Sequence, residues 1–351
     1  MEKHVTIRDI ASELGVSTGT VHRAIYDKKG VSAETQRKIL DLCIQRGYRA
    51  NIAASALKRH PLRIVGAFPV PDGKSQYFYS EVWRGFRRCM DESRDYNIES
   101  VEVFYYQGTS HDQSHELLDC YERYQGEIDA LVTIGHLDKA TKEALRLYTE
   151  NDIPIFLACD DLPDCGRIAC VQANHQATGC MVAELIASQI PAGSSVLLCA
   201  GDALTPSHSQ TIQGFEHFLV QNRIDLLPLK LYGYENEYDL RTRLRAELQQ
   251  NDHIRAAFSV SARLSVPLAE EVVASGRLDQ IRIIASDLFD ETVQNMEQGI
   301  VKNIVYKKPE RQAYLATKST IDFLLKAQRP IHDVEYVRSC IIFRSTLEMY
   351  L

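Results

Sequence analysis

Asp160 and Asp161 come closest, by residue type and spacing, to a catalytic pair, since two carboxylates can act as acid and base. Adjacent residues are poorly placed, however, to act on opposite sides of one bond, as glycoside hydrolysis requires. The sequence also lacks the GxxxxGK[ST] phosphate loop and the HExxH zinc motif. We therefore expect no enzymatic activity.

Cysteines are the residues most able to bind a metal or form disulfides, and the chain has nine. Cys159, Cys165 and Cys170 lie close together, but no pair has the CxxC spacing typical of a zinc site. The segment Met1–His4 does not begin a signal-peptide core. We expect reduced thiols, mostly buried, in a cytoplasmic protein that holds neither a metal nor a cofactor.

The elements that position such side chains must form more than one unit, because 351 residues exceed an ordinary domain. An apolar fraction of 45% and a charged fraction of 25% are typical of soluble globular proteins, and no apolar run could span a membrane. The charge is uneven. Residues 1–60 hold eleven Lys or Arg against six Asp or Glu, whereas residues 61–351 hold 29 against 41. A basic module on an acidic body is typical of polyanion binding, although a solvated surface has a similar composition.

Three helical patterns follow one another in the basic segment. Thr6 is a favoured N-cap residue, and apolar residues then recur at helical spacing up to Gly15. Ser17 caps a second short helix, and Ser32 opens a third that ends near Gly47. Helix, tight turn, helix is the arrangement that places a second helix in the major groove of DNA. Three-helix units also occur as purely structural modules.

Five short runs of this segment decide between the two interpretations. They are Thr6-Ile7-Arg8-Asp9-Ile10-Ala11, Gly15-Val16-Ser17, Thr20-Val21-His22-Arg23, Val31-Ser32-Ala33-Glu34-Thr35 with Arg37, and Gly47-Tyr48-Arg49-Ala50-Asn51. Together they closely resemble the headpiece of the lac repressor (LacI/GalR) family over its whole length. The resemblance implies an all-α helix-turn-helix headpiece over residues 1–50 that binds double-stranded operator DNA.

The resemblance also implies which side chains touch DNA. Arg23 is expected to contact guanine, because its planar fork matches the O6 and N7 acceptors. Gly19 offers no side chain, so sequence choice should depend on Thr18, His22 and Arg23. His22 replaces a serine common in the family, and either a base or a phosphate is its expected partner. Hydroxyls at helix N-termini are expected to hold phosphates, and the remaining contacts are Thr6, Ser17, Thr20, Ser32 and Thr35.

Residues 51–61 form the next segment, and taken alone they would be an amphipathic linker. In the family the matching stretch is a hinge helix whose leucine wedges into the minor groove, and Leu57 stands at that position. Asn51 and Ala54 are expected to share the DNA-facing surface. Such a wedge bends the duplex, and the added protein contact offsets the cost. The hinge forms between two chains, so we expect a homodimer on a pseudo-palindromic operator.

A different pattern begins at residue 62, where short β-branched runs alternate with helical patterns. The predicted strands are Leu62–Phe68, Ile98–Tyr105, Ala130–Ile134, Ile153–Ala158, Ser195–Ala200, Ala256–Val260 and Ile281–Ser286, with a helix from Ser80 to about Ser93. This alternation predicts parallel sheets covered on both faces. The strands are too many for one sheet, and a crossover is expected near Ala169–Asn174. Two lobes with a ligand cleft beyond the carboxyl ends of the strands follow.

The order and spacing of these elements over residues 62–351 resemble the periplasmic sugar-binding fold that the lac repressor family joins to its headpiece. The chain is more similar to the ribose-binding type than to the purine repressor. The resemblance implies an effector-binding and dimerisation domain with parallel sheets. The expected first lobe covers about 62–170 and 307–330, and the second covers about 171–306 and 331–351.

The resemblance places several ligand-binding residues after these strands. Gln76, Phe78 and Tyr79 match an amide and two aromatics that stack on a sugar ring, although they could instead pack the start of a helix. Asp160 and Asp161 follow a strand where relatives bind sugar hydroxyls with a carboxylate, although acidic pairs there are often solvated turns.

Asp287 matches the ligand carboxylate that recurs most often in the family. The resemblance also implies that Ser261 and Tyr306 bind the ligand. Ser261 stands where asparagine is usual in the family, and Tyr306 stands where glutamine is usual. His136 could face the cleft or lie on the surface.

The loop of residues 205–210 departs from the family, because many relatives place an arginine there. It offers Ser207, Ser209, His208 and Gln210 instead, which argues against a carboxylate or phosphate as the main anchor of the ligand and puts a simple aldopentose or purine in doubt.

We therefore expect a dimeric regulator whose affinity for operator DNA is controlled by a sugar or polyol, and a repressor is the expected kind. One alternative is the same regulator with a non-sugar effector. A ligand-binding or enzymatic domain without a transcriptional role is the other, and the helix-turn-helix argues against it.

Overall fold

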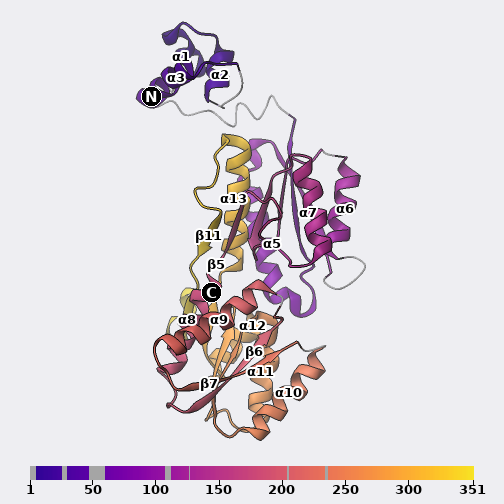
Figure 1. Cartoon of the computed structure of the whole chain (residues 1–351), viewed down its shortest axis with the longest axis vertical. Helices are drawn as coiled ribbons and strands as arrows, with labels where there is room; N and C mark the ends of the chain where they lie inside the picture. Colours follow the sequence, from indigo (N-terminus) through magenta and orange to yellow (C-terminus); the bar gives the residue numbers. More distant parts are fainter. Residues whose placement is uncertain are drawn as a thin grey trace.

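The computed structural model describes residues 5–25, 30–46, 60–106, 112–125, 127–203, 205–233 and 236–351. It contains a helical N-terminal unit and an α/β body of two lobes, as the sequence predicted (Figure 1). The hinge residues Asn51, Ala54 and Leu57 lie outside the described residues.

Three short helices pack around one small core in the N-terminal unit. They are α1 (Ile7–Leu14), α2 (Thr18–Ile25) and α3 (Ala33–Gln45). Ile10, Val21 and Ile39, one from each helix, are fully buried in this core. The predicted order of helix, tight turn and helix is therefore present, with α2 as the second helix.

The first lobe is a six-stranded parallel sheet in the order β11-β5-β4-β3-β1-β2. Helices α5 and α13 pack together on one face, and α6 and α7 cover the other (Figure 1). Both faces are apolar because helices cover each of them. The strands are β1 (Leu62–Pro69), β2 (Ile98–Tyr105), β3 (Ala130–Thr133), β4 (Ile155–Cys159), β5 (Ala169–Ala173) and β11 (Val334–Val337). The helices are α5 (Gln76–Glu92), α6 (Gln113–Tyr124), α7 (Lys139–Glu150) and α13 (Pro309–Lys326).

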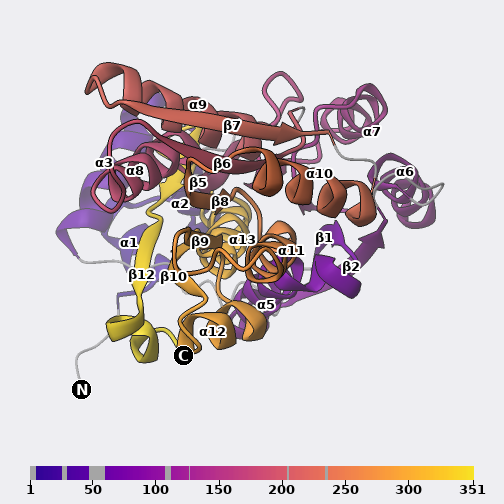
Figure 2. The same cartoon turned by 90° about the horizontal axis from the view of Figure 1, so that it is seen from below.

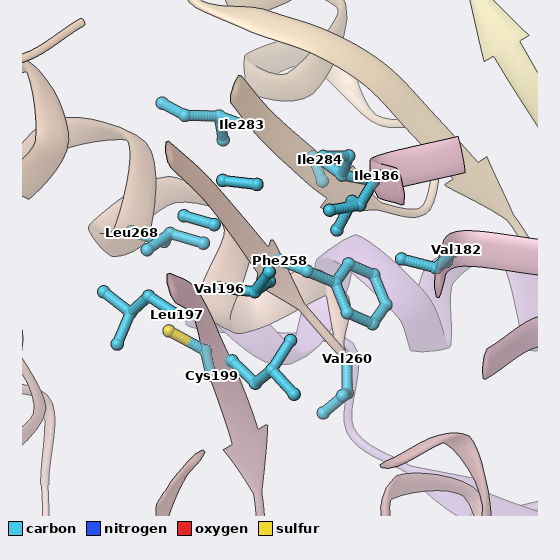
Figure 3. Close-up of a cluster of buried hydrophobic side chains, with 14 of the residues drawn as sticks. Val182, Ile186, Val196, Leu197, Cys199, Phe258, Val260, Leu268, Ile283 and Ile284 are labelled. Atoms are coloured by element: carbon cyan, nitrogen blue, oxygen red, sulfur yellow. The ribbon is translucent and has the colours of Figure 1, made fainter. Parts of the chain in front are cut away.

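The second lobe has a similar sheet in the order β12-β10-β9-β8-β6-β7, in which only the pair β10 and β12 is antiparallel among the described strands (Figure 2). In its core, Phe258 lies close to Val182 and Ile186, while Leu268 lies beyond the strand on the other side (Figure 3). The strands are β6 (Ser194–Gly201), β7 (Leu226–Tyr232), β8 (Ile254–Ser259), β9 (Arg282–Ser286), β10 (Val301–Tyr306) and β12 (Cys340–Phe343). The helices are α8 (His175–Ala187), α9 (Pro206–Gln221), α10 (Glu237–Gln250), α11 (Ala262–Ala274), α12 (Asp290–Glu297) and the 3₁₀ helix η3 (Arg344–Met349).

The chain passes between the lobes three times, and two of these passages lie further along the chain than the expected boundaries. The passages lie between β5 and α8, between β10 and α13, and between β11 and β12. Strand β11 pairs with β5 through Val334 and Cys170, so residues 334–337 belong to the first lobe and not to the second. Residues 171–173 also belong to the first lobe, because they complete β5. A strand at a sheet edge carries no sequence signal for which of two sheets it will join.

None of the helices in the described part of the chain is long and apolar enough to cross a membrane.

Helices α8 and α9 approach each other so closely that glycine is required at their crossing. A Cβ atom on Gly214 would lie 2.0 Å from the carbonyl oxygen of Gln176, and one on Gly179 would lie 1.9 Å from that of Thr211. Both distances are far inside van der Waals contact. Any larger residue must push the two backbones apart.

Gly214→Ala is therefore expected to lower the free energy of unfolding of the body by about 1–3 kcal/mol, as overpacking does. Urea denaturation followed by circular dichroism measures the change. Gly19→Ala in α2 is the matched control, because its nearest heavy atom would lie 3.6 Å away. The control should leave the unfolding of the body unchanged. Equal stability of Gly214→Ala and the parent protein would contradict the close crossing.

Candidate functional site

A cavity of about 120 Å³ lies between the two lobes, lined by loops that follow the carboxyl ends of the strands. This is where parallel α/β sheets bind ligands. The cavity contains Phe78, Tyr79, His136, Asp160, Ser207 and Ser261, all predicted as ligand-binding residues. Its other lining residues are Lys74, Ser75, Cys159, His175, Thr205, His208, Ala262, Arg263, Lys307 and Gln312.

The structure places four other predicted residues away from this cavity. Gln76 and Tyr306 line a second cavity of about 430 Å³. Asp161 forms a half-buried ion pair with Arg167, with one contact of 2.6 Å. The hydroxyl of Ser209 donates to the carbonyl oxygens of residues 205 and 206, within its own helix.

Asp287, the carboxylate favoured from the sequence, is occupied by a lysine. Its side chain is 1% exposed, and Lys307 Nζ lies 3.0 Å from Oδ2. The backbone N–H of Lys307 donates to Oδ1 at 3.1 Å, and Nζ donates to the carbonyl oxygen of Val260 at 2.9 Å. Lys307 thus lines the cavity with its charge already paired with Asp287. Tyr306, the residue predicted to line the cavity, directly precedes it. Neighbouring residues at the end of β10 point in opposite directions, which explains why Lys307 and not Tyr306 reaches this cavity.

The sequence analysis did not name four cationic or imidazole side chains of the lining. They are Lys74, His175, Arg263 and Lys307. Each follows the end of a strand, so the same positional signal could have identified them. The loop 205–210 lacks arginine, which counted against an anionic anchor, but Arg263 reaches the cavity from the first turn of α11, the helix after β8. Among the described residues, no group of three or more His, Cys, Asp or Glu side chains could hold a metal ion.

Three histidines of the lining are neutral, because burial lowers the pKa of His136, His175 and His208, the last to about 4. The negative charge of Asp160 acts against this lowering of the pKa in all three histidines. The tautomers of two rings follow from their partners. His175 Nε2 lies 3.2 Å from the carbonyl oxygen of Cys159 and must donate, which leaves Nδ1 as an acceptor. His208 Nδ1 accepts from the backbone N–H of Asp202 at 3.1 Å, which leaves Nε2–H as a donor.

Asp160 joins the two lobes across the cavity. It follows β4 of the first lobe, and its Oδ1 accepts from the backbone N–H of Ser207 in the second lobe at 2.9 Å. Its Oδ2 accepts from the Ser207 hydroxyl at 3.2 Å. Ser207 lies in the first turn of α9, where a carboxylate is favoured because N–H groups there have no partner in the helix. The carboxylate therefore stabilises a closed arrangement of the lobes.

Tyr77 makes a second link between the lobes. Its ring stacks on Phe289 with the centroids 4.1 Å apart, and its hydroxyl donates to Glu291 at 2.6 Å. Burial and Glu291 raise the pKa of Tyr77 to about 12, so the hydroxyl remains a donor at neutral pH. An ion pair between Lys74 and Glu237 adds a third link. These contacts come from separate elements of the second lobe, α9, α10 and α12.

Tyr77→Ala removes both the stacking and the hydrogen bond, so it is expected to shift the ligand-free protein toward an open cleft. Small-angle X-ray scattering should then report a larger radius of gyration than in the parent protein. Tyr238→Ala is the control, because Tyr238 on α10 is 77% exposed. Identical scattering from Tyr77→Ala and Tyr238→Ala would show that Tyr77 does not hold the lobes together.

The neutral histidines predict a loss of stability in acid. An unfolded histidine titrates near pH 6.5, whereas folded His208 has a pKa of about 4, so protons bind the unfolded chain preferentially between these values. Stability is complete above pH 6.5 and is expected to fall below it, by at most about 1.4 kcal/mol per pH unit for each such group. Urea titrations of His208→Gln should give a shallower slope. The exposed His115→Gln is the control, and equal slopes would contradict the assignment.

Several of the predicted DNA-binding residues cap the helices of the helix-turn-helix. Ser17 Oγ accepts from the backbone N–H of Thr20 at 3.0 Å, and Ser32 Oγ accepts from that of Thr35 at 3.2 Å. Thr6 caps α1 in a reciprocal capping box with Asp9. These hydroxyls therefore set the starts of the helices, a role that leaves their remaining hydrogen-bonding capacity for phosphates.

The first turn of α2 is open to solvent. Thr18 and Gly19 are exposed, while Val21 and Ala24 on the opposite side are buried. Arg23 is half-buried, and its Nη2 lies 3.4 Å from the hydroxyl of Thr20. The side chain of His22 lies outside the described atoms. The exposed surface of α2 thus contains Thr18 and Gly19, at the end that a recognition helix points toward bases.

Comparison with known proteins gives matches for both units. Residues 66–328 match the family described as periplasmic binding protein domain, and residues 6–51 match the family described as bacterial regulatory proteins, lacI family. The HTH-type transcriptional regulator RegA of Clostridium saccharobutylicum is 40% identical over 93 residues, which are 26% of this chain and 27% of RegA. Catabolite control protein A of Priestia megaterium is 23% identical over 264 residues, 73% of this chain and 74% of that protein.

Solved structures agree with the fold of the body. The solute binding protein of an ABC transporter from Burkholderia graminis, in complex with D-arabinose, superposes with a TM-score of 0.73 at 14% identity. The superposition covers 83% of this chain and 98% of that one. An identity this low shows the fold and no more. Through its body the chain therefore belongs to the periplasmic binding protein domain family, and it joins this body to a helix-turn-helix unit of the lacI family of bacterial regulatory proteins.

Proposed function

We propose that this regulator binds a pseudo-palindromic operator as a homodimer, and that a sugar-like effector in the cavity between the lobes controls its operator affinity. The observation that carries the proposal is the union, in one chain, of a helix-turn-helix with an exposed first turn of α2 and a two-lobed body with a cavity between the lobes. Repression is the proposed outcome of operator binding. The cytoplasm, where bacterial DNA lies, is the proposed location.

The lining of the cavity supports a polyhydroxylated effector. The rings of Phe78 and Tyr79 lie edge to face, 5.3 Å apart, and offer apolar surface to a sugar ring. Ser207, Ser261 and His175 add hydroxyl and imidazole groups that can donate to or accept from sugar hydroxyls. Asp160 and His136 are proposed to take part as well. Few polar groups at fixed positions within apolar walls are typical of small-molecule sites.

The size of the cavity fits a monosaccharide. A water molecule needs about 10–15 Å³ of cavity volume. A cavity of 120 Å³ therefore holds roughly eight to twelve groups of the size of a water molecule. A pentose or hexose has about this number of non-hydrogen atoms. A nucleotide or a disaccharide would require a wider separation of the lobes.

The proposed switch couples the cavity to the DNA-binding unit. An effector that favours one arrangement of the lobes shifts the first lobes of the dimer relative to each other, and this changes the spacing of the Asn51, Ala54 and Leu57 segments. The shift can be no larger than the difference in effector affinity between the two arrangements. Because Asp160 and Tyr77 already link the lobes, the ligand-free protein is proposed to populate the closed arrangement by itself.

Operator binding tests the proposal. A duplex selected from a random pool by the full chain serves as operator, and its affinity is measured with and without a ligand found by thermal shift. Arg23→Ala is expected to lower the preference for that duplex over a scrambled one by about 1–3 kcal/mol, since a bidentate contact to guanine contributes this much. Lys38→Ala is the control, because Lys38 pairs with Glu34 on the surface of α3.

The outcomes separate the parts of the proposal. No preference of the parent protein for any selected duplex would contradict sequence-specific binding. An operator affinity that stays constant at saturating concentrations of every ligand bound by the body would contradict effector control.

A further inference from the structure

The charged side chains of the cavity lining already have partners within the protein. Lys74 and Lys307 each form an ion pair with an acidic residue. Asp160 accepts two hydrogen bonds from Ser207, and Arg263 also interacts with other groups of the protein. None of these charges therefore requires an oppositely charged group from the ligand.

His175 differs from them, because one of its ring nitrogens has no partner. The side chain is 4% exposed and lines the cavity. Nε2 lies 3.2 Å from the carbonyl oxygen of Cys159, whereas Nδ1 has no hydrogen-bond partner among the described residues. Because the bond to Cys159 requires a proton on Nε2, Nδ1 of the neutral ring can only accept. A buried acceptor without a donor costs free energy, so this nitrogen is suited to a donor from the ligand.

The position of this nitrogen is fixed by the elements around it. His175 is the first residue of α8, and the side chain of Asn174 caps this helix by accepting from the backbone N–H of Ala177 at 2.9 Å. The bond to Cys159 then ties the ring to the end of β4, which belongs to the other lobe. A binding group that is held in this way needs little ordering when the ligand arrives.

A second group in the same lining lacks a partner. The hydroxyl of Ser261 is buried, caps no backbone N–H of α11 and has no hydrogen-bond partner within the described part of the chain. The carbonyl oxygen of Ser261 accepts from the hydroxyl of Ser259 at 2.6 Å and from that of Ser265 at 3.3 Å, so its backbone is held in place. A serine hydroxyl can both donate and accept, which suits a hydroxyl of the ligand.

These two groups favour a ligand rich in hydroxyls over an acidic one. Nδ1 of His175 requires a donor, and an ionised carboxylate offers acceptors only. A hydroxyl can donate to this nitrogen, and another hydroxyl of the same molecule can pair with Ser261. The ligand thus combines several hydroxyls with no need for a charge.

We infer that His175 is a specificity-determining residue, whose Nδ1 accepts a hydrogen bond from one hydroxyl of a neutral monosaccharide or polyol, while Ser261 binds another hydroxyl of the same molecule. This inference rests on the proposed function and names the residue that selects its effector. His175 binds the effector through one ring nitrogen and the opposite lobe through the other. A sugar that lacks this one hydroxyl leaves Nδ1 buried and unpaired, and it therefore binds more weakly.

Calorimetric titration of the full chain tests the inference in two steps. The first panel contains the D-aldopentoses, the D-aldohexoses, their alditols and myo-inositol, with the matching aldonic and uronic acids and D-glucosamine and D-galactosamine. At least one neutral compound is expected to bind, and at least as tightly as its charged counterparts. In the second step each hydroxyl of this compound is replaced in turn by fluorine, which cannot donate. One fluoro analogue is expected to bind about tenfold more weakly, because it leaves Nδ1 unpaired.

His175→Gln is the diagnostic variant, because its amide can keep the bond to Cys159 but leaves no acceptor at the position of Nδ1. It is expected to bind the neutral compound about tenfold more weakly and to lose its sensitivity to that one fluoro substitution. Such non-additivity reports a direct contact, whereas a purely structural role of His175 would weaken both compounds equally. His217→Gln is the matched control, because His217 is an exposed histidine on α9 of the same lobe.

Circular dichroism shows whether both variants are folded. Ser261→Ala is a second diagnostic variant, since it removes only an unpaired hydroxyl, and it should show the same non-additivity with a different fluoro analogue. This variant keeps the inference testable if His175→Gln does not fold.

The remaining outcomes are decisive as well. Tighter binding of an acid or an amino sugar than of its neutral parent, no binding of any neutral compound, or additive losses in both variants would overturn the inference. If a neutral sugar changes operator affinity while His175→Gln binds it as the parent protein does, the proposed function stands without the inference. If His175 is coupled to one hydroxyl but operator affinity does not respond to the sugar, the inference stands and the proposed control of DNA binding fails.

Discussion

The arrangement of the two lobes depends on Gln312, whose side chain ties two of the three passages together. Its Oε1 accepts from the backbone N–H of Ala173 at 3.0 Å, and its Nε2 donates to the carbonyl oxygen of Lys307 at 2.7 Å. The third passage is joined to the first by a hydrogen bond of 2.9 Å between the hydroxyls of Thr178 and Ser339. Because these hydrogen bonds fix the passages to one another, we expect the lobes to rotate about this point without sliding past each other. In such a motion the rear of the cavity would keep its shape while its mouth opens.

The buried pair of Asp287 and Lys307 shows how this point constrains chemistry. Taking both charges out of water is expensive, and removing one partner from such a pair typically costs about 3–5 kcal/mol because the other charge is left alone. Asp287 also has a φ of 62°, a left-handed conformation that is unusual for a residue other than glycine. Strain of this kind persists where surrounding contacts enforce it, and it gathers at functional sites. Both features place the ammonium group of Lys307 at a set position in the lining of the cavity.

The sequence predicted the architecture better than it predicted the site. The runs that became β1 and β2 are rich in apolar residues, so they were recognisable without the structure, and Ile98–Tyr105 has the same bounds in both. Strand β11 was missed because its short alternating sequence fits an edge of either sheet. Phe78 and Asp160 were predicted from the resemblance to the periplasmic sugar-binding fold, and both line the cavity. Whether Tyr306 or Lys307 enters the cavity depends on one residue of register, which patterns along a single chain do not determine.

The contact between Asp160 and Ser207 links two processes that are usually separate. Helix α9 lacks a capping side chain of its own, since Thr205 makes no such bond, and its first turn is completed by a carboxylate from the opposite lobe. Opening the cleft therefore removes the hydrogen-bond acceptor of the Ser207 backbone N–H. In an ordinary helix, fraying of the first turn would have the same effect. The free energy of lobe opening thus includes a contribution from secondary structure. Any substitution that alters the intrinsic stability of the first turn of α9 will change the resting position of the whole molecule, even though it touches neither DNA nor effector.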